Sequence, residues 1–196
     1  MIKIGDIYKT NNFGDIKIVE RIKDEKRSDR WIVEFLKTGT RVETYSHNIN
    51  RGSIKDYFQP TTCGIGYLGE LGGKAGSHPM KTVWEGMIGR CYNKENKDYC
   101  GKTTVCERWH NFTNFVEDVE KLPFYDKRLS EGGRKWQLDK DILGRGKMEY
   151  SPENCIWIPA QMNSCVGGIY EMINMGFKIE YPEKEEIIDY IKRRYL

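Results

Sequence analysis

Two side chains in the last third of the chain, Asp139 and Asn163, carry oxygen atoms of the kinds that a divalent cation binds. Mg²⁺ prefers oxygen ligands and keeps several waters, so one carboxylate and one amide oxygen from a protein can hold it. A cation held in this way stabilises the charge that develops when a phosphodiester bond is cleaved, provided that a base activates water. These residue types therefore indicate phosphodiester chemistry as a candidate.

The residues around these side chains predict a strand, a loop, a second strand and a short helix over residues 136–164. Asp139 ends an apolar stretch, a Gly-rich polar loop follows it, and Asn154 opens a second apolar run. Asn163 lies on the short helical pattern that comes next. We expect this unit to bring Asp139 and Asn163 within reach of a single ion.

This unit resembles the HNH endonucleases, also called ββα-metal or His-Me finger nucleases, and in particular their phage-encoded branch related to homing endonucleases. The resemblance rests on LDKD at residues 138–141, SPENCIW at 151–157 and QMN at 161–163. It implies that Asp139 and Asn163 bind Mg²⁺ or Mn²⁺, and that Asn154 braces the loop through backbone hydrogen bonds. Weaker likeness in the preceding segments extends the resemblance over most of the chain.

Lys140 stands where the family has its general-base His. A Lys with the ordinary pKa of about 10.4 is protonated at neutral pH and cannot accept a proton from water. Burial that lowers this pKa would make Lys140 a catalytic base, whereas a cationic Lys140 would bind phosphate in a fold that holds DNA without cutting it. His78 or His110 could instead reach the site from another segment.

Two functions follow from the resemblance. The first is a phage-type, metal-dependent DNA endonuclease in which Asp139, Lys140 and Asn154 are the catalytic group. The alternative is a catalytically degenerate protein that binds DNA or a host factor, in a regulatory or anti-defence role. We expect DNA as the partner, with a host or phage protein as the other candidate, while the sequence does not indicate an oligomeric state.

Basic residues around the predicted loop suit a phosphate backbone, because they neutralise its charge. A solvated loop tip is the other interpretation of the same residues. The predicted nucleic-acid-binding residues are Arg134, Lys135, Arg145 and Lys147.

The composition of the 196-residue chain favours a globular protein: 38% of its residues are hydrophobic, 31% are charged, and the formal net charge is +3. Its six cysteines are too sparse for a disulfide scaffold, and we interpret them as reduced thiols. Cys91, Cys100, Cys106 and His110 form no Cys-x-x-Cys pair, so we do not expect a structural zinc site. Without a signal peptide or an apolar run long enough for a bilayer, we expect a protein of the cytoplasm, of the host cell if phage-encoded.

The pattern along the chain predicts an α+β protein with four parts. Residues 1–58 alternate apolar and polar positions between turn signals, which favours a small SH3-like β-barrel. Residues 59–79 are rich in Gly and are interpreted as a linker, although Gly also suits a backbone surface that contacts a ligand. Residues 80–170 carry two amphipathic helices and the ββα-metal unit, and residues 171–196 form an extension with a terminal helix from Pro182 to Tyr195.

Overall fold

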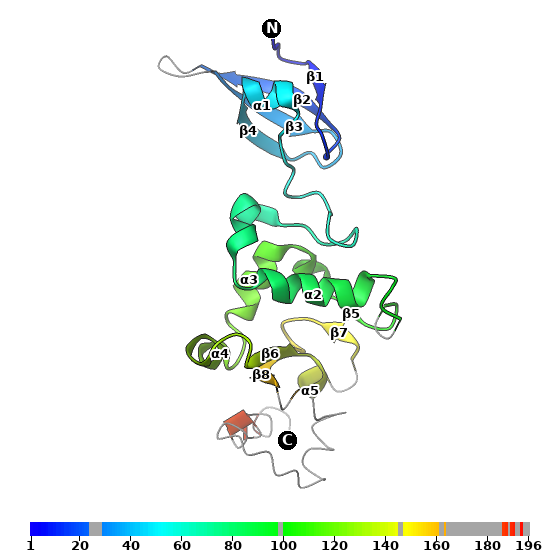
Figure 1. Ribbon diagram of the computed structural model, residues 1–196, viewed down its shortest axis with the longest axis vertical. Helices are drawn as coiled ribbons and strands as arrows, with labels where there is room; N and C mark the ends of the chain where they lie inside the picture. Colours follow the sequence, from blue (N-terminus) through cyan, green and yellow to red (C-terminus); the bar gives the residue numbers. More distant parts are fainter. Residues whose placement is uncertain are drawn as a thin grey trace.

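The computed structural model is a mixed α+β protein with an N-terminal sheet followed by helices and two small sheets (Figure 1). None of the helices in the described part of the chain is long and apolar enough to span a bilayer. The structure describes residues 1–23, 29–97, 100–144, 147–160, 163, 186, 187, 189, 190 and 193.

The N-terminal sheet is antiparallel and contains β1 (Ile7–Lys9), β2 (Asp15–Ile22), β3 (Arg30–Phe35) and β4 (Arg41–Tyr45), in that order. Every second residue of β3 is buried, so one face of the sheet covers a core, as the alternating pattern predicted. Within the described residues β1 and β4 do not pair, and closure into the expected barrel is not detected.

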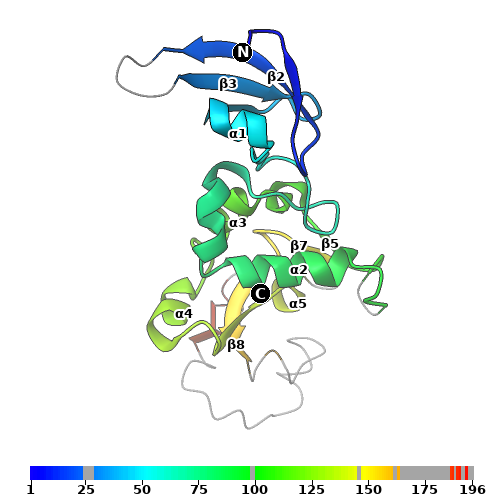
Figure 2. The same cartoon turned by 45° about the horizontal axis from the view of Figure 1, so that its top comes forward.

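A short helix that the sequence analysis did not predict, α1 (Ser46–Arg51), follows β4 and packs Ile49 into the core of the sheet. It ends at Gly52, whose φ of 63° is left-handed. A Cβ at Gly52 would lie 2.9 Å from Asn11 Oδ1, so the close approach of the β1–β2 loop also requires glycine here. In Figure 2, α1 lies on the side of the sheet that faces the helices of the second half.

The helices of the second half are η1 (Gly69–Ser77), α2 (Lys81–Tyr92), η2 (Glu107–His110), α3 (Phe112–Val119) and α4 (Tyr125–Glu131). The two predicted amphipathic helices are α2 and α3, and each buries the apolar stripe that predicted it. The predicted cap of α3 is present as well, because the side chain of Asn111 accepts a hydrogen bond from Thr113 N at 2.9 Å.

Part of the Gly-rich segment folds against the second half of the chain. Within the segment that we interpreted as a linker, η1 packs on α3 and Ala75 is fully buried in the same core as the helices. The backbone carbonyl of Tyr57 accepts hydrogen bonds from Leu68 N at 3.0 Å and Gly69 N at 2.9 Å. These contacts join the N-terminal module to the second half, while the predicted boundaries between the parts stay predictions.

Two small sheets complete the second half. The strands β5 (Thr104–Val105) and β7 (Glu149–Tyr150) pair in parallel, and β6 (Trp136–Asp139) and β8 (Ile156–Pro159) pair antiparallel. A four-residue helix, α5 (Asp141–Gly144), begins the loop between β6 and β8. Figure 1 shows α2 and α3 between the N-terminal sheet and these short strands.

The β8 strand anchors the small sheets to the helical core. All four of its residues are buried, and Trp157 Nε1 donates a hydrogen bond to Val119 O at 2.9 Å. In the same core, Trp84 Nε1 donates to Trp109 O at 2.7 Å. The predicted terminal helix lies largely outside the described residues, although Glu186, Ile187, Asp189, Tyr190 and Arg193 are helical.

Candidate functional site

The paired strands β6 and β8 set the positions of the predicted site residues. Asp139 at the end of β6 pairs with Ile156 at the start of β8, and Trp136 pairs with Pro159. Ala160 follows β8 directly and is the first helical residue after it. The strand, loop, strand and helix therefore come in the predicted order, with Asp139 at one end of the strand pair and the helix at the other.

Asp139 caps the short helix α5. Its Oδ1 accepts hydrogen bonds from Asp141 N at 3.1 Å and Ile142 N at 2.9 Å, and only 5% of the residue is exposed. Burial raises the pKa of Asp139 from 3.8 to about 6, because desolvation disfavours the ionised carboxylate. Its carboxyl group is thus a structural cap and also a group that titrates near neutral pH.

Lys140 is also buried, with 3% of the residue exposed. Its Nζ donates a hydrogen bond to Asp141 Oδ1 at 2.5 Å and lies 5.5 Å from the centroid of the Tyr150 ring. In this arrangement Nζ donates to a carboxylate oxygen of the neighbouring residue. Neither of the two roles predicted for Lys140, catalytic base or phosphate contact, is tested by these contacts.

Asn154 lies in the turn before β8, and 5% of the residue is exposed. Its Nδ2 donates a hydrogen bond to Glu149 O at 3.2 Å, which joins the turn to β7 across five residues. This backbone contact is of the kind that a bracing residue makes. A catalytic role for Asn154 stays a prediction.

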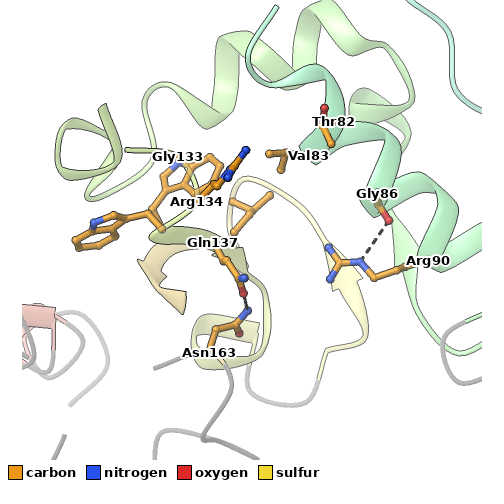
Figure 3. A pocket seen from close by; sticks show the side chains of 11 residues that line it. Thr82, Val83, Gly86, Arg90, Gly133, Arg134, Gln137 and Asn163 are labelled. Carbon is orange, nitrogen blue, oxygen red and sulfur yellow. Dashed lines mark hydrogen bonds between the residues drawn. The ribbon is translucent and has the colours of Figure 1, made fainter. Parts of the chain in front are cut away.

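Asn163 lies on the strand-pair side of a cleft of about 380 Å³ between α2 and β6 (Figure 3). Its Nδ2 donates a hydrogen bond to Gln137 Oε1 at 2.7 Å, so two amide side chains are joined at the wall of the cleft. Within the described ranges, the residues that line the cleft are Thr82, Val83, Gly86, Arg90, Gly133, Arg134, Trp136, Gln137, Leu138, Trp157 and Asn163.

Two arginines face this cleft from different elements. Arg90 comes from α2 and Arg134 from the loop before β6, as Figure 3 shows. Arg90 Nε donates to Gly86 O of its own helix at 3.3 Å, and its guanidinium lies 5.6 Å from the centroid of the Tyr150 ring. Among the residues that the structure describes, no carboxylate forms an ion pair with either guanidinium, so within this part of the chain two positive charges face the cleft without an acidic partner.

The sequence analysis missed Arg90 and Gln137 as cleft residues. A signal for Arg90 was present, because Thr82, Val83, Gly86 and Arg90 repeat at helical spacing beside the apolar stripe of α2. That spacing identifies a second face of the helix, but it does not say what packs opposite.

The predicted nucleic-acid-binding residues have different surroundings. Arg134 lines the cleft, and Lys135 and Lys147 are exposed but are not among the lining residues. Arg145 lies outside the described residues.

The two histidines considered as alternative bases have other partners. His78 Nδ1 accepts a hydrogen bond from Met80 N at 3.2 Å, and its ring packs edge-on against Phe112. His110 Nε2 lies 3.1 Å from Val105 O and 3.3 Å from the Tyr92 hydroxyl. Both rings thus belong to the packing around α2 and α3.

The cysteines that we considered for a zinc site, and did not expect to form one, differ in burial. Cys91 is in the hydrophobic core, and burial raises the pKa of its thiol to about 11, which disfavours the thiolate that zinc requires. Cys100 is half-buried. Over the described ranges, no three His, Cys, Asp or Glu side chains form a cluster that could hold a metal ion.

The predicted magnesium ligands are only a partial fit for the ion. Asp139 Oδ1 already accepts two backbone hydrogen bonds, and Asp139 does not line the cleft that Asn163 lines. No hydrogen bond joins the two side chains, both of which the structure describes. Metal binding by Asp139 and Asn163 stays a prediction.

Comparisons of the chain with protein-family models, with curated proteins and with solved structures gave no match. The resemblance to ββα-metal endonucleases stays a prediction.

Proposed function

We propose that this chain is a DNA-binding protein that holds a phosphodiester backbone in the cleft between α2 and β6. The observation that carries the proposal is that Arg90 and Arg134 face one cleft, with no acidic partner among the described residues. An anion is the complement of two such guanidinium groups, and arginine matches the geometry of phosphate oxygens.

The other polar groups of the cleft suit the same ligand. Gln137 and Asn163 carry amide groups that can donate to phosphate oxygens or to base edges. The cleft, at about 380 Å³, has the size of a site for one nucleotide unit rather than for a whole duplex. We therefore expect only one strand of the DNA to enter the cleft.

The finer description of the fold belongs to this proposal. The order of β6, the loop with α5 and β7, β8 and the helical residue Ala160 supports a ββα-metal unit. The four-stranded N-terminal sheet is consistent with a module of SH3-like type that accompanies it. In this interpretation the N-terminal module adds a second surface to a nuclease-like fold.

Hydrolysis of the bound strand is the second candidate, and one observation favours it. Asp139 has a pKa of about 6, and a carboxyl group that titrates near neutral pH is suited to general acid–base chemistry. Its burial and its two backbone hydrogen bonds favour binding without cleavage, which is why binding is proposed first.

Binding is tested by the fluorescence anisotropy of a labelled oligonucleotide, single-stranded or duplex, over a range of salt concentrations. Arg90→Ala and Arg134→Ala should each weaken binding roughly tenfold and lower the slope of log affinity against log salt by about 1. Arg51→Ala is the control, since Arg51 is an exposed arginine in α1 and does not line the cleft. A double variant that combines Arg90→Ala with Arg134→Ala should bind more weakly than Arg51→Ala. Equal DNA affinities for these two proteins would exclude the cleft as the binding surface.

Cleavage is tested by nicking of supercoiled plasmid with Mg²⁺ or Mn²⁺ added. Nicking by the wild-type protein that is lost in Asp139→Ala would establish hydrolysis as the function. An intact plasmid together with salt-dependent binding would establish the binding protein. Absence of both would leave a protein partner as the alternative to pursue.

A further inference from the structure

A buried arginine lies behind the wall of the cleft. Arg128 belongs to α4, only 6% of the residue is exposed, and its guanidinium carbon lies 4.6 Å from the centroid of the Trp157 ring. Its Nε is buried and has no hydrogen-bond partner among the residues that the structure describes. No carboxylate in the described part of the chain pairs with its guanidinium.

An arrangement of this kind is energetically unfavourable unless an anion offsets it. Burial lowers the pKa of Arg128, because desolvation disfavours its charged form. The face of Trp157 attracts the guanidinium through a cation–π interaction, but this offsets only part of the cost of removing a cation from water. A negative charge placed nearby would recover the remainder.

Two of the residues that touch Arg128 also line the cleft. Trp157 is one of them. Gly133 is the other: a Cβ added there would lie 2.8 Å from Arg128 Nη2, so the absence of a side chain leaves room for the guanidinium. The positive charge of Arg128 is therefore one residue away from the space that Arg90 and Arg134 face.

We propose that Arg128 is a positioning residue for anions, a buried cation that raises the positive potential of the cleft without forming part of its surface. The inference rests on the proposed function for its natural ligand, the phosphodiester group. A charge fixed in a low-dielectric interior acts over a longer distance than an exposed lysine, which water and salt screen. Arg128 thus strengthens the binding of any phosphate that Arg90 and Arg134 contact.

The test compares Arg128→Met with Arg128→Lys in the full chain. Methionine fills a similar volume without charge, so Arg128→Met should bind a duplex or single-stranded oligonucleotide roughly tenfold more weakly, while its melting temperature is unchanged or higher. Arg128→Lys keeps the charge and should retain most of the affinity. A purely structural arginine would give the opposite result, with a lower melting temperature and unchanged affinity of the folded protein.

Gly133→Ala is the second variant, needed if Arg128→Met does not fold. The added Cβ must displace the guanidinium, so this variant should also bind more weakly. Gly89→Ala in α2 is its control, because a Cβ at Gly89 meets nothing within 4 Å and Gly89 does not line the cleft. Equal affinities for the two alanine variants would overturn the inference.

Binding measurements with inorganic phosphate, made beside those with DNA, distinguish a failure of this inference from a failure of the proposed function. If the wild-type protein binds no DNA, but phosphate raises its melting temperature in a manner that Arg128→Met abolishes, the anion role stands and the DNA proposal fails. If DNA binds equally to the wild type and Arg128→Met, the DNA proposal stands and the anion role fails. If neither DNA nor phosphate binds to the wild type, both fail.

Discussion

The ionisation of a single residue at the end of β6, Asp139, affects the free energy of unfolding. Asp139 is buried, it caps α5 and its pKa is raised to about 6. Between pH 4 and pH 6 the folded protein therefore binds more protons at this site than the unfolded chain does, so the free energy of unfolding falls as pH rises through this window. At neutral pH Asp139 is ionised in both states and its unfavourable burial is fully present.

We expect Asp139→Asn to remove this pH dependence, because an amide oxygen keeps the acceptor without the charge. The wild-type protein should lose roughly 2–3 kcal/mol of stability from this group between pH 4 and pH 7, and the variant should not. Urea unfolding across this range measures the difference. Asp126→Asn, at an exposed position in the first turn of α4, should leave the pH profile of the wild type unchanged. A profile for Asp139→Asn parallel to that of the wild type would contradict the assignment.

The sequence predicts candidate polar residues of the site by type, but it does not predict their contacts. Asp139, Asn154 and Asn163 were chosen because their oxygen and amide groups suit a metal and a loop brace. The sequence did not predict that Asp139 Oδ1 accepts hydrogen bonds from the backbone of α5. The residues LDKD do not indicate that a helical turn follows Asp139. The partner of Asn163, Gln137, became visible only when β6 and the helix after β8 were placed together.

At the scale of elements, the period of apolar residues predicts helices directly, whereas glycine content is compatible with more than one structure. The stripes of α2 and α3 predicted both helices, because burial of one face dominates helix formation in proteins. The glycines of residues 59–79 indicate a linker or a backbone surface that contacts a ligand, and in the structure η1 within this segment packs on α3. Glycine permits close approach as well as flexibility, and only the three-dimensional contacts distinguish the two uses.

The contact between η1 and α3 gives a sharp prediction. Gly69 has a φ of 66°, and a Cβ there would lie 2.0 Å from Oδ1 of Asn111, the residue that caps α3. Gly69→Ala should therefore lower the free energy of unfolding by more than about 2 kcal/mol, through backbone strain and loss of the cap. Thermal and urea unfolding measure the loss.

Gly76→Ala in the same segment is the matched control, since a Cβ at Gly76 meets nothing within 4 Å. Its stability should stay within about 0.5 kcal/mol of the wild type. Similar losses for the two variants would mean that η1 tolerates no side chain for reasons unrelated to Asn111.

At the scale of the whole molecule, the described residues form two separate hydrophobic cores. One belongs to the N-terminal sheet and includes Val33, and the other joins the helices and small sheets and includes Val119. The backbone hydrogen bonds to Tyr57 O connect the two halves. Because no buried residue is shared between the cores, each half should respond to damage largely on its own.

Two matched truncations test this independence in the intact chain. Val33→Ala and Val119→Ala each remove two methyl groups from a fully buried side chain, at a cost of about 2 kcal/mol. Hydrogen exchange should speed up in the N-terminal sheet for Val33→Ala and in α2, α3 and β8 for Val119→Ala. Faster exchange in both halves for either variant would show that the protein unfolds as one unit.

The parallel pairing of β5 with β7 has a consequence for biosynthesis. The strands of the N-terminal sheet all lie before Ser46, so a ribosome delivers every partner of that sheet early. Thr104 in β5, in contrast, pairs with Glu149, and its pairing waits until the later strand has left the exit tunnel. The nascent chain therefore holds a complete N-terminal sheet while β5 still lacks its partner strand, so the second half finishes folding only after residues 149–150 have been synthesised.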